Sequence, residues 1–268
     1  MLVDVTPPPA RPCRLLAFDT ATEVMSLAVV TPQQVWSVDA EGGAMASSAL
    51  IPSLLALLAQ AGCRLQQLDA IAYGCGPGAF TGLRTTCSVA QGLACGADKP
   101  VLPVDSLMLV AESVREVALE HGAHTVWVAQ DARMDEVYAA AYRWHEARPG
   151  EHRAAHWETT TAPALYTLPA LNQRWAQSPW TTGHARGSVV IAGSALTVMG
   201  ERLHSGGAPR LGAAVATTRA RALANLAITR WEDGALLDAA DAVPLYLRDK
   251  VAQTTEEREA ARAAKELV

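Results

Sequence analysis

Aromatic side chains and long apolar runs are scarce in this chain of 268 residues. Aromatic residues make up 5% of the sequence, and phenylalanine occurs at 2 positions. The longest apolar stretch, Ala49–Ala59, is interrupted by Pro52 and Ser53, so we expect no membrane-spanning helix. Half of the residues are nevertheless hydrophobic and 18% are charged. This balance excludes intrinsic disorder and predicts helices packed closely on sheet.

Paired cysteines and an excess of basic charge are also lacking. Lys and Arg number 22 against 27 Asp and Glu, a net charge of -5, which is the wrong sign for a protein that grips nucleic acid by itself. The 5 cysteines include no C-x-x-C pair, which excludes a disulfide framework and a zinc ribbon. We expect small buried thiols in a reducing compartment at Cys13, Cys63, Cys75, Cys87 and Cys95.

The two ends of the chain differ in composition from the rest. Met1–Arg14 contains Asp4 and three consecutive prolines but no apolar segment, which argues against a secretory signal. We expect residues 1–13 to form a disordered leader and residues 251–268 a charged tail of helical propensity. The sequence therefore indicates a soluble, cytoplasmic protein.

A strand, an acidic bend and a return strand occur twice along the chain. The first copy is Leu15–Val30, in which Asp19 ends a buried strand, and the second is Val126–Tyr138, in which Asp131 takes the place of Asp19. Val190–Gly193 and the run after it similarly repeat Ile71–Gly74 and its helix. Two matches in the same order predict an α/β protein made of two similar halves, each a mixed sheet with helices.

We place the first half at residues 14–105 and the second at 106–250. Helix 214–231 belongs to the second half by sequence, although it could pack back near the first. The further elements that we expect are helices at Ser47–Gln60 and Leu83–Cys95, strands at Leu68–Tyr73 and Pro100–Val104, a connection at Leu107–Glu120, strand-and-loop decoration at Arg148–Ser188 and a strand-like segment at Pro244–Arg248.

The most unusual segment is the glycine-rich loop that leads from a predicted strand into a helix. Gly74, Gly76 and Ala79 satisfy G-x-G-x-x-A, but the dinucleotide fingerprint belongs to the first strand of its unit, and here two strands and a helix come before it. A plain turn with Thr81 as helix N-cap is the alternative. Because a cap alone would not need three glycines and a proline, we favour a packing or partner-contact role.

The aspartates that end the two repeated strands are candidates for phosphate chemistry. Asp19, Thr20 and Asp131 could hold Mg²⁺ or orient water, or they could simply cap the bends. Neither bend contains a lysine, so we interpret them as a vestigial phosphate site. The pair His152 and His156 has metal-ligand spacing only if it is helical, and the adjoining Pro and Gly favour a loop. We therefore expect no metal and no catalytic residue.

The motifs together resemble those of the bacterial tRNA threonylcarbamoyladenosine biosynthesis family TsaB, also called YeaZ. The resemblance spans about Arg14 to Gln253. Its residues are Leu15–Glu23, Leu68–Gly74, the loop Gly76, Pro77, Gly78, Ala79, Phe80, Thr81, Gly82, Leu83 and Arg84, then Val89–Ala94, Asp131–Tyr138 and Pro244–Arg248.

This resemblance implies a duplicated ribonuclease-H-like fold of the actin-like ATPase superfamily. It implies a non-catalytic scaffold subunit that binds and supports the transferase subunit TsaD, which modifies adenosine beside the anticodon of tRNAs that read ANN codons. The ATPase subunit TsaE is the implied third member, and the tRNA is contacted only indirectly. No membrane partner and no cofactor are implied, except ATP or ADP at the assembled interface.

The resemblance also places the partner interface, and a competing homodimer contact, on two helices of the first half. Family members often have a His-Thr or His-Ser pair before the first helix, where this chain has Ala46 and Ser47. Two alternatives stay open: a nucleotide-binding phosphotransferase of the same fold, which would use Asp19 and Asp131, and a metalloprotease. The interface residues that we expect are Leu50, Leu54, Leu58, Leu83, Thr86, Ala90 and Leu93.

Overall fold

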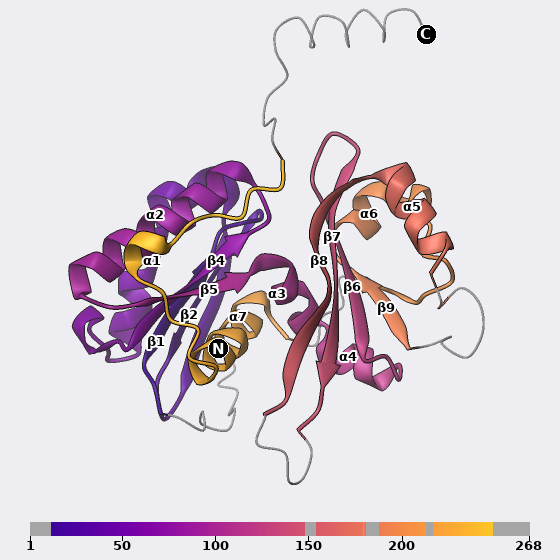
Figure 1. Ribbon diagram of the computed structural model, residues 1–268. Coiled ribbons are helices and arrows are strands. Elements are labelled where there is room, and N and C mark those ends of the chain that lie inside the picture. Colours follow the sequence, from indigo (N-terminus) through magenta and orange to yellow (C-terminus); the bar gives the residue numbers. More distant parts are fainter. Residues whose placement is uncertain (1–11, 148–153, 179, 181–187, 213–216, 249–268) are drawn as a thin grey trace, which may run out of the picture.

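The protein contains two five-stranded mixed sheets with helices on both faces of each (Figure 1). The computed structural model describes residues 12–147, 154–178, 180, 188–212 and 217–248. The predicted leader, except for its last two residues, and the predicted tail lie outside these ranges. Cys13, at the end of that leader, is buried in the first half.

The first sheet has the strand order β3-β2-β1-β4-β5. Its central strand β1 pairs antiparallel with β2 and parallel with β4. All five residues of β1 are buried, because Leu16 and Phe18 face one core and Leu15 and Ala17 face another. The strands are β1 (Leu15–Asp19), β2 (Val24–Val30), β3 (Val35–Glu41), β4 (Ala70–Gly76) and β5 (Val101–Asp105).

The second sheet repeats this topology with the order β8-β7-β6-β9-β10. Its central strand β6 pairs antiparallel with β7 and parallel with β9, as β1 does with β2 and β4. The duplication that the sequence predicts is therefore confirmed. The strands are β6 (Thr125–Asp131), β7 (Glu136–His145), β8 (His156–Thr167), β9 (Val189–Ala192) and β10 (Arg210–Leu211).

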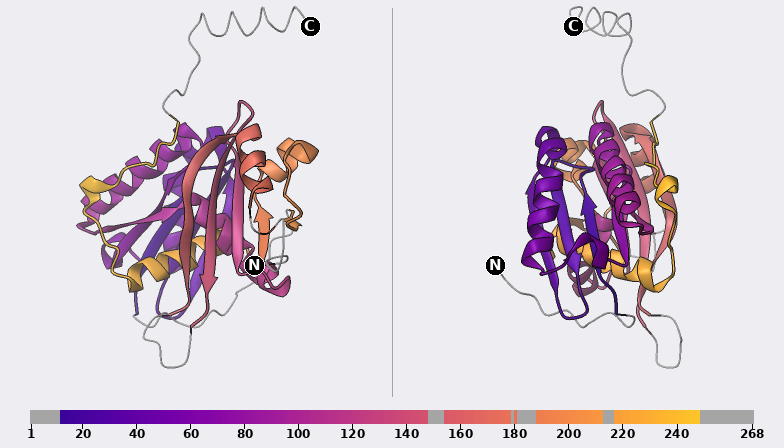
Figure 2. Two further views of the ribbon diagram at one scale, coloured as in Figure 1. Left: turned by 45° about the vertical axis from the view of Figure 1, so that its right-hand side comes forward. Right: turned by 90° about the vertical axis from the view of Figure 1, so that its left-hand side faces the viewer.

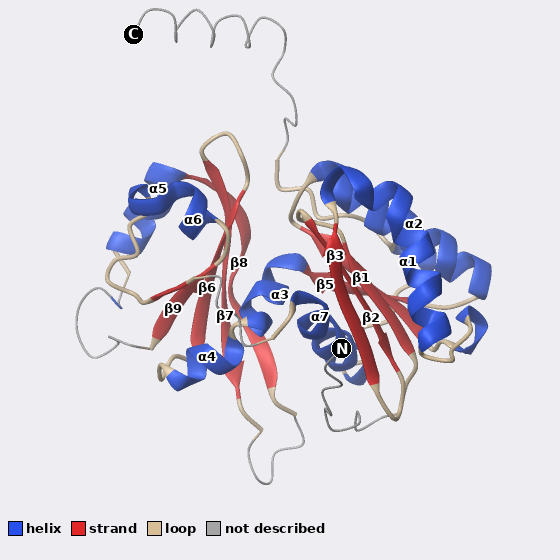
Figure 3. Ribbon diagram, turned by 180° about the vertical axis from the view of Figure 1, so that it is seen from behind, coloured by secondary structure: helices blue, strands red, loops and turns tan. Residues whose placement is uncertain are grey.

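Helices form three layers around the two sheets (Figures 1 and 3). Helices α1 (Ala46–Gln60) and α2 (Phe80–Ala97) cover the outer face of the first sheet, and α5 (Leu168–Ala176) and α6 (Ala195–Met199) the outer face of the second. Between the sheets lie α3 (Ser106–Ser113), α4 (Arg115–Glu120) and α7 (Arg219–Glu232). Short 3₁₀ helices occur at Gly43–Met45, Leu65–Gln67, Gly200–Arg202 and Ala239–Asp241.

The two halves exchange their inner helices. Helix α3 follows the last strand of the first sheet, yet its Leu107 and Ala111 pack on the second sheet. Helix α7 comes from the second half, yet its Leu223 and Ala227 pack on the first sheet. Each sheet is covered on its inner face by a helix that comes from the other half of the chain. This exchange fastens the two halves to each other.

Several element predictions are wrong in detail. Helix α2 begins at Phe80 with Ala79 as its N-cap, so Thr81 is not the cap. The helix predicted at 214–231 begins at Arg219, where the Thr218 side chain accepts the Arg221 N–H. Residues 213–216 lie outside the described ranges. Residues predicted as decoration form strand β8 and helix α5, whose N-cap is Thr167.

The helical run predicted after Gly193 is only the five-residue α6. Pro244–Arg248, predicted as strand-like, belongs to no sheet. Leu245 N–H donates to Cys75 O at 2.7 Å, but the segment makes no ladder.

The prediction that no segment is apolar enough to cross a membrane is wrong for the segment that contains helix α1. The segment Gly43–Gln60, which includes α1, is long and apolar enough to cross a membrane, although Pro52 lies inside the helix. One such helix is weak evidence, because core helices of soluble proteins pass the same test. Leu50, Leu54, Leu57 and Leu58 of α1 are buried on the first sheet, so the helix belongs to the packed fold.

The prediction of buried thiols is partly wrong. Cys13, Cys63 and Cys87 are buried, Cys75 is half-buried and Cys95 is exposed. Burial raises the pKa of the Cys75 and Cys87 thiols to about 12. These two thiols are therefore poor nucleophiles at neutral pH.

Asp105 joins the two halves where α3 begins. Its carboxyl accepts the Leu107 and Met108 N–H groups at the N-terminus of α3 and the Tyr142 hydroxyl of β7 at 2.6 Å. Burial raises the pKa of Asp105 above its ordinary value, against the opposing effect of these hydrogen bonds. The folded protein therefore holds the Asp105 proton at pH values where the unfolded chain has lost it.

This arrangement predicts a pH-dependent difference between the wild type and Asp105→Asn. The free energy of unfolding of the wild type should fall as the pH rises from about 4, the unfolded-state pKa, through the raised folded-state pKa. The asparagine variant lacks this contribution, so its stability relative to the wild type should improve over the same interval. Urea unfolding between pH 4 and 8 measures the difference, and a constant difference would contradict the prediction.

Candidate functional site

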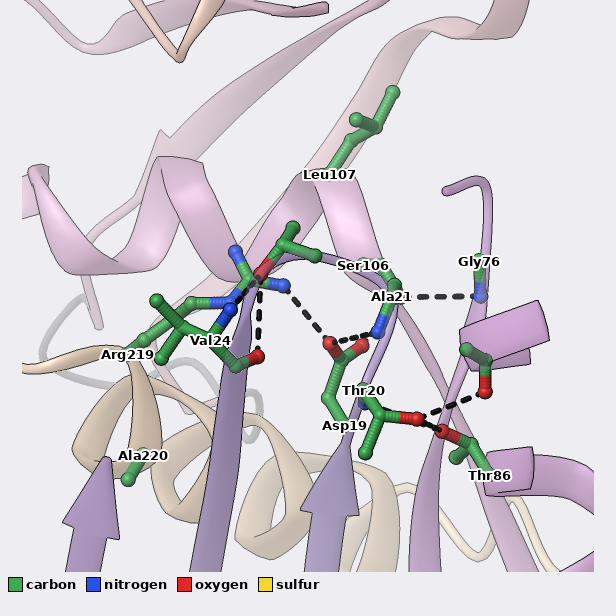
Figure 4. Close-up of polar contacts among 12 residues, drawn as sticks. Asp19, Thr20, Ala21, Val24, Gly76, Thr86, Ser106, Leu107, Arg219 and Ala220 are labelled. Carbon is green, nitrogen blue, oxygen red and sulfur yellow. Dashed lines mark hydrogen bonds and ion pairs between the residues drawn. The ribbon is translucent and has the colours of Figure 1, made fainter. Parts of the chain in front are cut away.

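The bend after β1 contains a network of buried polar contacts, and Asp19 lies at the centre of this network (Figure 4). Asp19 is fully buried. Its Oδ1 accepts the Ala21 N–H and the Arg219 guanidinium, each at 3.0 Å, and its Oδ2 accepts the Ser106 hydroxyl at 2.5 Å. Ser106 in turn accepts the Gly76 N–H at 3.1 Å. An internal cation and two donors thus occupy the carboxylate that would otherwise face Mg²⁺.

Thr20 is also bonded inside the protein. Its hydroxyl donates to Gly82 O at 2.8 Å and lies 2.6 Å from the Thr86 hydroxyl, and its N–H donates to Thr86 at 3.1 Å. These contacts tie the β1 bend to the first turns of α2. Thr20 is 1% exposed, so it presents no hydroxyl to a ligand.

The glycines of the loop allow this bend and α2 to approach each other. A Cβ at Gly74 would lie closer than 3.0 Å to the Asp19 carboxylate, and a Cβ at Gly82 equally close to Thr20 O. Gly78 faces Ala21 in the same way. In the second half Gly193, at the place that corresponds to Gly74, faces Ala129 O. The loop thus has a packing role, which the sequence analysis favoured over a plain turn.

The second bend uses ion pairs instead of an enclosed carboxylate. Asp131 accepts the Arg133 N–H at 3.0 Å and lies 3.6 Å from its guanidinium, which also pairs with Glu23 of the first bend at 3.2 Å. Arg133, Met134 and Asp135 all have positive φ, a conformation that costs about 1–2 kcal/mol per residue. The Asp131 carboxylate therefore supports a strained turn.

A cleft of about 950 Å³ lies between the two bends. Its walls are largely apolar, and its lining includes Val24, Phe80 and Met134. Each arginine that lines it has a carboxylate partner in the described structure: Arg133 with Glu23, Arg219 with Asp19, and Arg248 with Glu136. In the described structure the cleft therefore offers no unpaired guanidinium to a phosphate.

The segment after η5 (Ala239–Asp241) closes the far side of this cleft. Tyr246 packs against Phe80 with ring centroids 5.3 Å apart, and the Arg84 guanidinium lies 3.9 Å from the Phe80 centroid. Arg248 pairs with Glu136 and donates to Ala132 O at 2.9 Å. The segment therefore links the glycine-rich loop of the first half to the β6–β7 turn of the second.

The predicted interface residues are placed in the core. Six of the seven are buried against the first sheet or the β1 bend, and Leu93 is half-buried: Leu50, Leu54, Leu58, Leu83, Thr86, Ala90 and Leu93. They face inward because they form the stripe of each helix that covers the apolar sheet. Six of these side chains therefore offer little surface to a partner, and the interface itself stays a prediction.

Other apolar side chains of α1 and its N-cap face outward, and none of them was predicted to lie at the interface. Met45, Ile51 and Leu55 are 56%, 44% and 53% exposed. Between Met45 and Gln60 there is no charged residue. Because α1 is apolar on all sides, its sequence gives no signal of which stripe faces the sheet.

Only His156 of the predicted histidine pair lies among the described residues. His156 lies in strand β8, where it stacks on His145 with centroids 5.1 Å apart. His152 lies outside the described residues. Among the residues that the structure describes, no group of three or more His, Cys, Asp or Glu could hold a metal.

Two sheets of the same strand topology, with inner helices exchanged between them, define a duplicated α/β protein. The chain is 32% identical to a Pseudomonas aeruginosa protein described as uncharacterized with similarity to peptidase YeaZ. That match covers 88% of this chain and 100% of the other, with a TM-score of 0.71. YeaZ from Pseudomonas aeruginosa matches over the same shares at 31% identity and a TM-score of 0.69. The chain belongs to the TsaB family, also called YeaZ.

Matches to curated relatives are partial. TsaB of Haemophilus influenzae is 41% identical over 124 residues, which is 46% of this chain and 51% of that protein. TsaB of Escherichia coli is 38% identical over 149 residues, which is 56% of this chain and 61% of that protein. The chain thus aligns with about half of each curated relative. The family model for TsaD, tRNA N6-adenosine threonylcarbamoyltransferase, matches residues 44–160.

Proposed function

We propose that this protein is a non-catalytic scaffold subunit of the machinery that makes N6-threonylcarbamoyladenosine beside the anticodon of tRNAs reading ANN codons. It binds and supports the transferase subunit TsaD. Membership of a family named for this biosynthesis supports the pathway. The match of residues 44–160 to the TsaD family supports an origin shared with that partner. Related folds can pair pseudosymmetrically, as copies of one chain do.

The outward face of α1 and α2 carries this proposal. The two helices contact each other on the outside of the first sheet (Figure 2). Met45, Ile51 and Leu55 expose apolar side chains there, and α2 adds the small residues Ser88 and Gly92. A face of this kind, apolar on α1 and with Arg84 as an exposed charge on α2, is typical of a protein interface.

The inner site supports a role without catalysis. Arg219 and Ser106 bind the Asp19 carboxylate, and Gly82 and Thr86 engage Thr20. Ser106 is 3% exposed, and its described hydrogen bonds are to Asp19 and Gly76. Because Arg219 and Ser106 engage the Asp19 carboxylate, it is not free to hold Mg²⁺, and this arrangement disfavours the phosphotransferase alternative.

The further partners follow from the same proposal. TsaE is the third subunit, and the tRNA reaches the complex through TsaD, in keeping with the net charge of -5. Self-association through the α1–α2 face competes with TsaD, because one face serves both contacts. The large cleft of the isolated subunit holds no cofactor, and ATP or ADP acts as a cofactor only at the assembled interface. The complex is cytoplasmic.

Substitution of the outward face should separate partner binding from folding. In Ile51→Arg and Leu55→Arg a charge replaces an exposed apolar side chain, so the free energy of unfolding should change by less than about 0.5 kcal/mol. Affinity for TsaD should fall at least about tenfold. Copurification and calorimetric titration with TsaD measure this loss. The reconstituted tRNA modification should fall in parallel.

The control variant, Val198→Arg, lies on another surface of the protein. Val198→Arg changes an exposed apolar residue of the second half and should leave TsaD binding intact. Leu54→Arg is unsuitable as an interface test, because Leu54 is 1% exposed and a buried arginine there should unfold the protein. Wild-type affinity in both outward variants would refute the α1–α2 interface. Full tRNA modification without this chain would refute the scaffold role itself.

A further inference from the structure

A second pocket opens in the half that lies away from the α1–α2 face. Its volume is about 690 Å³, within the usual range for small-molecule sites. It lies where strands β6, β7 and β8 meet the last turn of α5. Its lining includes Trp127 and Ala141. Part of the pocket lies within Arg148–Ser188, which the sequence predicts to be strands and loops added to the second half.

The pocket is basic, although the chain as a whole is acidic. Arg143, Arg174 and His124 line it, and its described lining contains no Asp or Glu. Within the described residues, neither Arg143 nor Arg174 forms an ion pair with a carboxylate, whereas the arginines of the large cleft all do. Glu158, opposite Arg143 in the β7–β8 register, is bonded to His145 at 2.7 Å. The Arg174 guanidinium therefore remains available to an anion, and Arg143, whose charge also acts on Glu158, adds positive charge beside the pocket.

Aromatic surface lies beside these cations. Trp180 is half-buried, and its indole N–H donates to Ser205 O at 3.4 Å, which helps to fix the ring. Its centroid lies 5.9 Å from that of Trp127, and the Arg174 guanidinium lies 5.4 Å from the Trp127 centroid. Trp127 itself is 4% exposed, so Trp180 is the ring that can receive a flat ligand.

We propose that this pocket binds a nucleotide unit. Arg143 and Arg174 pair with the phosphate, and Trp180 stacks on the base. Arginine forks match phosphate oxygens, and base stacking on aromatic side chains is common in binding of single-stranded nucleic acid. The hydroxyl groups of Thr125, Thr160 and Thr161 in the lining can accept or donate hydrogen bonds to a ribose or phosphate. This site is separate from the large cleft and from the α1–α2 face.

Titrations of the isolated full chain test the proposal. The probes are AMP, a single-stranded oligoadenylate, adenosine and inorganic phosphate, and the readouts are tryptophan fluorescence and the indole N–H resonance of Trp180. AMP should bind with a dissociation constant on the order of 1 mM or tighter. Adenosine or phosphate alone should bind at least about tenfold more weakly, because each lacks one of the two contacts. Tighter binding of the oligonucleotide than of AMP identifies RNA as the source, and equal binding identifies the free nucleotide.

Matched variants locate the binding. Arg174→Gln, Arg143→Gln and Trp180→Ala should each weaken AMP binding at least about tenfold. Arg202→Gln, which alters an exposed arginine paired with Asp135 in the same half, should have no effect. Failure of both AMP and the oligonucleotide to shift the wild-type Trp180 resonance at about 1 mM would overturn the proposal, even if a variant failed to fold. Because no partner subunit is present, that failure would leave the scaffold function untouched.

Discussion

Gly82→Ala is expected to destabilise the protein by about 3 kcal/mol, a large share of the 5–15 kcal/mol that holds a typical domain folded. The new Cβ would lie closer than 3.0 Å to the backbone oxygen of Thr20. A backbone oxygen cannot move aside as the end of a flexible side chain can. The β1 bend or the start of α2 must therefore shift, which would lengthen the 2.8 Å hydrogen bond from the Thr20 hydroxyl to Gly82 O.

Gly92→Ala is the control in the same helix. A Cβ at Gly92 would meet nothing within 4 Å, so the change should raise the free energy of unfolding by up to about 1 kcal/mol, since alanine is the better helix former. Urea unfolding of both variants measures the contrast. Equal effects of the two substitutions would show that helix propensity, and not the close approach at Thr20, determines the result.

Arg219→Met is expected to cost about 3 kcal/mol or more, because it leaves the Asp19 carboxylate buried without its cation. Asp19 is fully buried, and the Arg219 side chain is 14% exposed. The guanidinium joins α7 of the second half to β1 of the first. The loss should therefore lower the cooperativity between the halves as well as their stability.

A double-mutant cycle separates the ion pair from other effects of the substitution. Asp19→Asn combined with Arg219→Met should be more stable than the sum of the single losses implies, because no charge is left unpaired. Arg202→Met removes an exposed ion pair with Asp135, whose side chains are 59% and 70% exposed. It should cost less than about 1 kcal/mol. Strict additivity of the two changes at Asp19 and Arg219 would contradict the pairing argument.

Local patterns were enough to predict the repeated unit. Asp19 and Asp131 each end a buried strand before a polar bend, and the alternation on either side of the bend is visible over a few residues. The packing role of the glycines followed from their number, although their contacts with Asp19, Thr20 and Ala21 did not. Elements with local signals were therefore predicted well, with errors mainly at their ends.

The failed predictions concern contacts between distant parts of the chain. Arg219 lies 200 residues from Asp19, and no local spacing connects them. Thr81 fits the sequence preference of an N-cap, yet α2 begins one residue before it because the Ala79 N–H is bonded to Ala21 O. Pro244–Arg248 alternates like a strand, but its side chains bind the loop of one half and the turn of the other.

The sequence by itself determined the duplication, the strand–bend–strand unit of each half, and the family, because these depend on short-range alternation and on motifs with fixed spacing. The tertiary structure alone decided which stripe of α1 stays exposed. An all-apolar helix has no polar side to mark its surface, so Leu54 or Leu55 becomes core according to how the helix lies on the sheet. It also decided that Asp19 binds Arg219, since only the exchange of inner helices brings those two charges together.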